Sequence, residues 1–91
     1  MNNVNVIKRF LEGESGQTNL RQILNGVFYY KGRTLTTNGQ ELVNYSTVIA
    51  YKEGKNLYLN SGKYSVTTSK IQRQLENLAK EYYKEENIFY Y

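Results

Sequence analysis

The sequence offers few side chains for covalent or acid–base chemistry. Its 91 residues include no His and no Cys, and its eight acidic residues are all Glu. The usual imidazole base, thiolate nucleophile and aspartate metal ligand are therefore missing. The closely spaced glutamates are Glu12 with Glu14 and Glu85 with Glu86, and a solvated surface explains both pairs better than acid–base catalysis. We expect a protein that is not an enzyme and that holds no cofactor and no metal.

Two short motifs approach catalytic or nucleotide-binding signatures without meeting them. Seven residues separate Gly54 from Gly62, and Tyr64 follows Lys63. A phosphate-binding loop has four residues between its glycines and a Ser or Thr after the lysine. Ser69 beside Lys70 has the residue types of a Ser/Lys nucleophile, but a helix cap explains the hydroxyl equally well.

A binding surface is the stronger candidate, and its centre is the segment from residue 63 to residue 70, where alternating periodicity gives way to helical periodicity. Lysines, hydroxyl groups and the free amides of a helix start favour an anion such as phosphate or carboxylate. The predicted binding residues are Lys31, Arg33, Tyr45, Thr47, Lys63, Tyr64, Ser65, Thr67, Thr68, Lys70 and Arg73.

Three interpretations of these residues stay open. Tyr and Arg are enriched at the hot spots of protein interfaces, which favours a protein partner. Tyrosines mixed with cations on a sheet would also suit a single nucleic-acid strand, because every base can stack on a ring. In the third interpretation the tyrosines are core residues and the hydroxyls only cap a helix.

Length and charge indicate one small domain, residues 1–91. A chain this short buries only about 60 to 65% of its unfolded surface and cannot support two cores. No apolar run approaches the roughly 20 residues of a membrane span, so we expect a cytoplasmic protein with no membrane partner.

The net charge is +4, and the basic excess lies in residues 1–66, which suits phosphate or an acidic protein surface.

The amino-terminal third predicts one helix followed by less regular segments. Val4, Ile7 and Phe10 share one helical face after Asn3 as a cap, so we expect a short helix over about 3–12 that ends at Gly13. Residues 14–18 are polar and predict a loop. Residues 19–25 favour one or two helical turns.

Residues of about 27–60 predict strands joined by tight turns. Asn38-Gly39 is a strong hairpin signal, and Glu53-Gly54 is a second predicted turn. Two-residue loops at these positions would set Leu35 opposite Leu42 and Ala50 opposite Leu57. A loop at Lys31-Gly32 would bring Phe28 opposite Leu35.

The carboxy-terminal third predicts a long helix over about 69–86. Ser69 and Gln72 have the spacing of a capping box, and residues 64–66 would add a short strand before it. The buried face would carry Ile71, Leu75, Leu78, Ala79 and Tyr82. The aromatic tail, residues 87–91, is expected to pack on a sheet edge, with a dimer contact as the alternative.

Two segments resemble motifs of a family of small proteins of unknown function encoded by bacteriophages and other mobile elements. Tyr45-Ser46-Thr47-Val48-Ile49-Ala50 resembles Tyr-Gly-Thr-x-Ile-Ala, with Ser46 in place of the glycine. Residues 64–72 resemble Tyr-Ser-x-Thr-Thr-Ser-Lys-x-Gln. The resemblance implies a phage or prophage protein that acts inside a bacterium, and small phage proteins of this kind often resemble inhibitors of host defence such as anti-CRISPR proteins.

We therefore expect an α+β fold, in which an antiparallel meander of four or five strands carries a short amino-terminal helix and a long carboxy-terminal helix packed on one face. The leading functional hypothesis is a phage- or prophage-encoded protein that inhibits a CRISPR-Cas-like defence complex in the bacterial host. It would do so by stoichiometric association with an effector protein or nucleoprotein. The first alternative is a nucleic-acid-binding accessory protein with DNA or RNA as its partner. The second is a homodimeric structural component.

Overall fold

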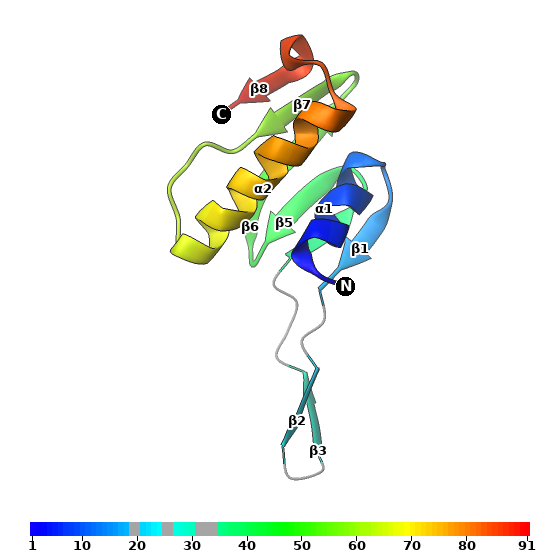
Figure 1. The fold of residues 1–91 in the computed structure, drawn as a ribbon, viewed down its shortest axis with the longest axis vertical. Coiled ribbons are helices and arrows are strands. Elements are labelled where there is room, and N and C mark those ends of the chain that lie inside the picture. The colour runs from blue at the N-terminus through cyan, green and yellow to red at the C-terminus, as the bar shows by residue number, and fades with distance from the viewer. Residues whose placement is uncertain (19–20, 25–26, 31–34) are drawn as a thin grey trace.

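The computed structural model describes residues 1–18, 21–24, 27–30 and 35–91, with the backbone alone described between 21 and 30. The predicted α+β class is confirmed: two helices lie together on one face of a mostly antiparallel sheet (Figure 1). The described elements are α1 (Asn3–Leu11), β1 (Ser15–Gln17), β2 (Arg21–Leu24), β3 (Val27–Tyr30), β4 (Leu35–Asn38), β5 (Glu41–Asn44), β6 (Thr47–Glu53), β7 (Asn56–Leu59), α2 (Val66–Tyr82), the 3-10 helix η1 (Glu85–Asn87) and β8 (Ile88–Tyr90).

The main sheet has six strands in the order β1-β4-β5-β6-β7-β8. The predicted meander is confirmed for β4 to β7, which pair antiparallel in chain order. Two edge strands were not predicted: β1 pairs with β4, and β8 returns from α2 to pair parallel with β7. The hairpin of β2 and β3 is a separate two-stranded sheet that extends away from the main sheet in Figure 1.

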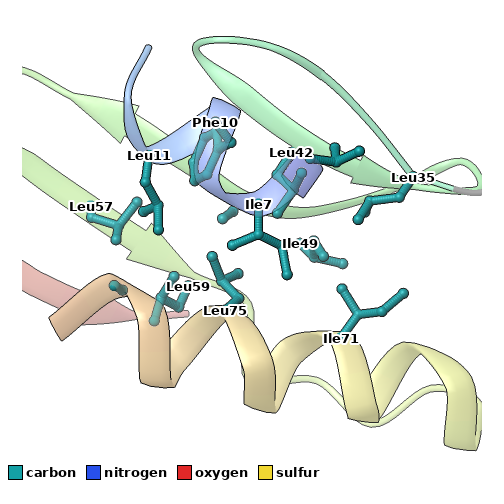
Figure 2. Close-up of a cluster of buried hydrophobic side chains, with 13 residues drawn as sticks. Ile7, Phe10, Leu11, Leu35, Leu42, Ile49, Leu57, Leu59, Ile71 and Leu75 are labelled. Atoms are coloured by element: carbon teal, nitrogen blue, oxygen red, sulfur yellow. The ribbon is translucent and has the colours of Figure 1, made fainter. Parts of the chain in front are cut away.

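The core lies between the two helices and one face of this sheet (Figure 2). Each large apolar side chain that leaves water contributes about 1.5–3 kcal/mol before the entropic cost is subtracted. The cluster takes members from both helices and from β4 to β7: Val6, Ile7, Phe10, Leu11, Leu35, Leu42, Ile49, Ala50, Leu57, Leu59, Ile71, Leu75 and Ala79.

Regular alternation along a strand would place Ile49 and Ala50 on opposite faces of the sheet, but a β-bulge between β5 and β6 brings both to the helix-covered face. Leu42 pairs with Ala50 whereas Val43 pairs with Val48, so Ile49 is an extra residue in β6. Both Ile49 and Ala50 are consequently buried.

The predicted strand registers are wrong by two residues at two turns. Thr37 pairs with Leu42 and Glu53 pairs with Asn56, so each glycine is the first residue of its loop, not the second. Gly39 has φ +91° and Gly54 has φ +60°, and a positive φ at the first loop position suits a type II′ turn.

The register error did not change which side chains are buried. Leu35 pairs with Asn44 in place of Leu42, and Ala50 pairs with Leu59 in place of Leu57. Because side chains alternate with a period of two, a slip of two residues keeps every side chain on its face.

The predictions for residues 14–25 are wrong over 15–17 and 21–24. Residues 15–17 form β1 in place of a loop, and residues 21–24 form β2 in place of a helix. The strand over 27–30 is confirmed, but it pairs with β2, which places Phe28 opposite Ile23 and not opposite Leu35. The predicted turn at Lys31-Gly32 lies outside the described residues.

Both helix caps lie earlier in the sequence than predicted, although α1 itself begins at the predicted residue 3. Asn2, not Asn3, caps α1, and its side-chain oxygen accepts from the Asn5 amide at 2.8 Å. Ser65, not Ser69, caps α2 and accepts from the Thr68 amide at 3.2 Å, so residues 64–66 form no strand. The Gln72 side chain donates to the carbonyls of Asn60 and Gly62, which removes it from the predicted capping box.

The carboxy-terminal tail packs on the sheet edge, as predicted. The helix ends at Tyr82, earlier than the predicted residue 86, and η1 then turns the chain into β8. Beyond β8, the Tyr91 amide donates to the Leu59 carbonyl, and the Ser61 amide donates back to the Tyr91 carbonyl. The tail therefore completes the sheet within one chain.

We predict that Gly39→Ala destabilises the protein more than Gly54→Ala does. Both glycines have positive φ, so alanine strains the backbone at either site by about 1–2 kcal/mol. At Gly39 a Cβ would also lie 2.6 Å from the Gly13 carbonyl oxygen, whereas nothing lies within 4 Å of a Cβ at Gly54. Urea unfolding of the two variants measures the difference, and equal losses would contradict this packing of the β4–β5 turn against the end of α1.

We also predict that Ser65→Ala lowers the free energy of unfolding by about 1 kcal/mol through loss of the α2 cap. Ser69 is exposed within the helix, so Ser69→Ala serves as the matched control. It should change the free energy by no more than about 0.5 kcal/mol. If chemical denaturation showed a larger loss of unfolding free energy for Ser69→Ala than for Ser65→Ala, Ser69 would be the cap, as predicted from the sequence.

Candidate binding surface

Exposed cationic, aromatic and hydroxyl side chains gather where the chain enters α2. Val66, the first residue of the helix, is 89% exposed, and Tyr64 just before it is 47% exposed. Lys70 and Arg73 follow Val66 at helical spacing and are also exposed. We call this set the α2 start surface, and it comprises Tyr45, Lys63, Tyr64, Val66, Thr67, Lys70 and Arg73.

A buried chain of hydrogen bonds fixes the first turn of α2 against the sheet. The Thr68 hydroxyl donates to Asn44 Oδ1 at 2.6 Å, and the Ser65 hydroxyl donates to Thr68 Oγ1 at 3.1 Å. Asn44 is 1% exposed and Thr68 is 5% exposed. In this dry setting, the bond is worth more than one made at the surface. The β5–β6 turn, which follows Asn44, is thereby held beside the start of α2.

The β5–β6 turn presents Tyr45 in an unusual backbone conformation. Tyr45 has φ +56° and is 63% exposed. A left-handed conformation costs a residue other than glycine roughly 1–2 kcal/mol, and such strain is found at binding sites more often than elsewhere. Thr47, which pairs with Asn44 at the start of β6, is half-buried.

The loop that carries Lys63 and Tyr64 is tied to both neighbouring elements. Asn60 Nδ2 donates to the Val48 carbonyl and to Tyr64 Oη, each at 3.0 Å. Gln72 on α2 donates to the carbonyls of Asn60 and Gly62. The α2 start surface therefore rests on backbone and side-chain contacts with the sheet.

The α2 start surface is electropositive. The first turn of α2 contains no acidic residue, and the amino-terminal end of a helix adds a partial positive charge. In the part of the chain that the structure describes, the ion pair is Arg9 with Glu14 at 3.1 Å, and no acidic side chain pairs with Lys63, Lys70 or Arg73. An anionic group would therefore meet three cations that take part in no ion pair among the described residues.

The structure brings most of the predicted binding residues to this surface. Tyr45, Lys63, Tyr64, Thr67, Lys70 and Arg73 belong to it, and Ser65 caps the helix beneath it. Thr68 points inward to Asn44, so its hydroxyl positions the surface instead of facing solvent. Lys31 and Arg33 lie outside the described residues. Sequence reasoning missed Val66 and Asn44. A signal for Asn44 was present, because it follows the buried Leu42 by two positions and so shares its face.

The opposite face of the sheet is aromatic, and none of the described helices covers it. The rings of Tyr51 and Tyr58 stack with 4.8 Å between their centroids, and the Phe89 ring continues the row with its centroid 5.4 Å from that of Tyr58. The Tyr91 ring packs at a tilt against Tyr51, with 5.3 Å between the centroids. Burial raises the pKa of the Tyr91 hydroxyl, and nearby Glu41 adds to the rise.

The nucleic-acid hypothesis requires tyrosines mixed with cations on a sheet, and this aromatic face is less basic than that hypothesis requires. Its register places Glu41 beside Tyr51 and Glu53 two residues beyond it. Lys52 points to the helices instead, where it donates to the Phe10 carbonyl and lies 4.9 Å from the Phe10 ring centroid. Burial lowers the pKa of its ammonium group.

A shallow depression of about 490 Å³ adjoins this face at the β1–β4–β5 end of the sheet. It is lined by Ser15, Gly16, Gln17, Thr36, Thr37, Asn38, Glu41 and Val43. Among the described residues, no three acidic side chains gather to hold a metal ion. None of the described helices is long and apolar enough to cross a membrane.

Fold and surface together define a small α+β protein with one helix-covered sheet face and a cationic patch at the start of its second helix. Residues 18–89 match a family described as a family of unknown function (DUF8033), and the chain belongs to that family. No curated protein and no solved structure matches the chain.

We predict that Thr68→Val destabilises the protein by about 1–3 kcal/mol. The substitution keeps the shape of the side chain but removes the hydroxyl that donates to Asn44 Oδ1, so this buried oxygen loses one hydrogen bond. Thr67 is exposed in the same turn, so Thr67→Val is the control and should change stability by less than about 0.5 kcal/mol. Calorimetry of both variants decides, and equal stabilities would mean that the bond to Asn44 contributes nothing.

Proposed function

We propose that this protein is a non-enzymatic recognition protein whose α2 start surface binds an acidic patch on a partner protein. The observation that carries the proposal is the group of exposed cations outside any ion pair, Lys63, Lys70 and Arg73, beside a helix start that the buried Thr68–Asn44 hydrogen bond fixes. A cationic patch steers an acidic partner and fixes the register of the complex. Because the patch is held in place before binding, little ordering entropy is lost on association.

A protein partner accounts for the surface better than nucleic acid does. Phosphate contacts require only the cations, whereas the surface also exposes Val66, Tyr64 and Tyr45. Aromatic and apolar side chains beside Arg and Lys are the composition of a protein interface core and its rim. Nucleic-acid binding is the alternative, since phosphates would meet the same cations.

The resemblance to phage-encoded proteins supplies the finer part of the proposal. The segments that carry it, residues 45–50 and 64–72, are far apart in sequence, yet the bond between Thr68 and Asn44 holds them side by side. Motif residues that meet at one surface suit a shared partner. The proposed partner is an effector protein or nucleoprotein of a bacterial defence complex, which this protein would inhibit by association in the host cytoplasm.

The test compares two charge reversals on α2. Lys70→Glu with Arg73→Glu places two negative charges on the α2 start surface, and Lys80→Glu with Lys84→Glu makes the same change in net charge at the other end. All four side chains are exposed. In cells whose defence complex restricts a phage, the wild-type protein and the second variant should restore plaque formation. The first variant should lose at least about tenfold, or ~1.4 kcal/mol, of affinity for the purified effector.

A loss of stability would not explain weaker binding by the first variant. Lys80 lies in the last turn of α2, where a cation interacts favourably with the helix dipole, so its replacement costs the second variant stability and the first variant should melt at least as high as the second. Failure of the wild-type protein to restore plaques and to bind the effector would reject the proposal. The nucleic-acid alternative predicts that single-stranded or duplex oligonucleotides bind with an affinity that falls as salt rises, and that the first variant lowers the slope.

A further inference from the structure

We infer that β8 is a self-association edge, along which two copies of this chain pair antiparallel about a two-fold axis at Phe89. The inference is independent of the proposed function, since β8 and the α2 start surface belong to different elements. It rests on the free side of β8, on the aromatic row that ends there, and on a small cavity beside it.

β8 is the last strand of the sheet, and its outer side has no strand partner among the described residues. The Tyr91 amide and carbonyl both bond to the β7 side, to Leu59 and Ser61. Backbone groups alternate in direction along a strand, so Phe89 also faces β7, whereas Ile88 and Tyr90 face outward. The Ile88 amide is already used, because it donates to the Glu85 carbonyl. The Tyr90 amide and the Ile88 carbonyl remain directed away from the sheet.

These outward groups are self-complementary. In an antiparallel pair centred on Phe89, each Tyr90 amide donates to the Ile88 carbonyl of the second copy. The two Phe89 residues then form a non-hydrogen-bonded pair, in which side chains approach most closely. A two-fold axis requires this reciprocity, with the same patch used by both copies.

The aromatic row ends at the same residue. Tyr51, Tyr58 and Phe89 stack at 4.8 and 5.4 Å, close to the spacing of about 4.7–4.9 Å between neighbouring strands. Phe89 is nevertheless 42% exposed, because the row has no further ring beyond β8. Phe89 of a second copy would occupy the next place, and two rows would join into one.

The helix side of β8 has room for the remaining contact. Ile88 and Tyr90 alternate with Phe89 and so lie on the helix side, beside a cavity of about 160 Å³ lined by Lys80, Glu85, Ile88 and Tyr90. In the paired arrangement Tyr90 of the second copy comes opposite Ile88 and covers this cavity. Its hydroxyl would lie beside Lys80 and Glu85, both of which can hydrogen-bond to it.

The two edges of the sheet differ in how they resist pairing. β1 carries Ser, Gly and Gln and lies against α1. β8 is as short as β1, which limits pairing at both edges, but it consists of Ile, Phe and Tyr and lacks the Lys, Pro or bulge that would protect it further. The uncharged sequence favours a second copy, since no like charges meet across the axis within the strand.

Site-specific oxidation tests the pairing, because the chain has no cysteine of its own. Phe89→Cys places two thiols across the axis at a Cα separation of about 4.5 Å for such a pair, within the usual disulfide range of about 4.4–6.8 Å. Val66→Cys is the matched control at an exposed apolar position on α2, outside β8. Under mild oxidation the first variant should form a covalent dimer at least about ten times faster than the control. Equal rates would overturn the inference.

Sedimentation of the unmodified chain provides the second measurement. We expect a concentration-dependent dimer, and Phe89→Lys should raise its dissociation constant about tenfold or more because two charges would meet at the axis. Val66→Lys has the same change in charge and should leave the dimer unchanged. A chain that stays monomeric at every concentration would overturn the inference, including the case in which β8 accepts a strand from a different protein.

Discussion

The bond from the Thr68 hydroxyl to Asn44 sets the position of the long helix relative to the sheet. Apolar burial alone would allow α2 to slide along the core, because Ile71, Leu75 and Ala79 meet a broad apolar face with little directional preference. A buried polar pair has one good geometry and a large penalty for others. It therefore selects one placement, and the β5–β6 turn, the loop before α2 and the first helical turn become a single rigid surface.

The two faces of the sheet consequently have different physical roles. α1 and α2 cover one face and bury the apolar side chains of four consecutive strands. No helix of the described chain covers the other face, where the rings cover one another in a row across β6, β7 and β8. Stacking removes part of their surface from water without a second layer, which suits a chain too short to supply one.

Alternation and helical spacing in the sequence were sufficient for the α+β class, for strands β4 to β7 and for most of the core. They failed where one residue changed the outcome. The glycines mark the turns correctly but do not show whether each is the first or second loop residue, and the bulge at Ile49 has no periodic signal. Ser65 and Ser69 offer the same cap chemistry, and the choice between them depends on Asn44, a residue distant in sequence. The binding residues near α2 and Tyr45 could be proposed from their types, but only the fold shows that they lie on one surface.

The parallel strand β8 has a consequence for how the protein is made. β4 to β7 form hairpins from neighbouring residues, so this part of the sheet can assemble from local contacts as soon as it leaves the ribosome. The edge of β7 stays uncovered until α2 has been synthesised and the chain has crossed back over it. During that interval the nascent chain exposes an apolar strand edge, and its protection depends on the speed of translation or on a chaperone.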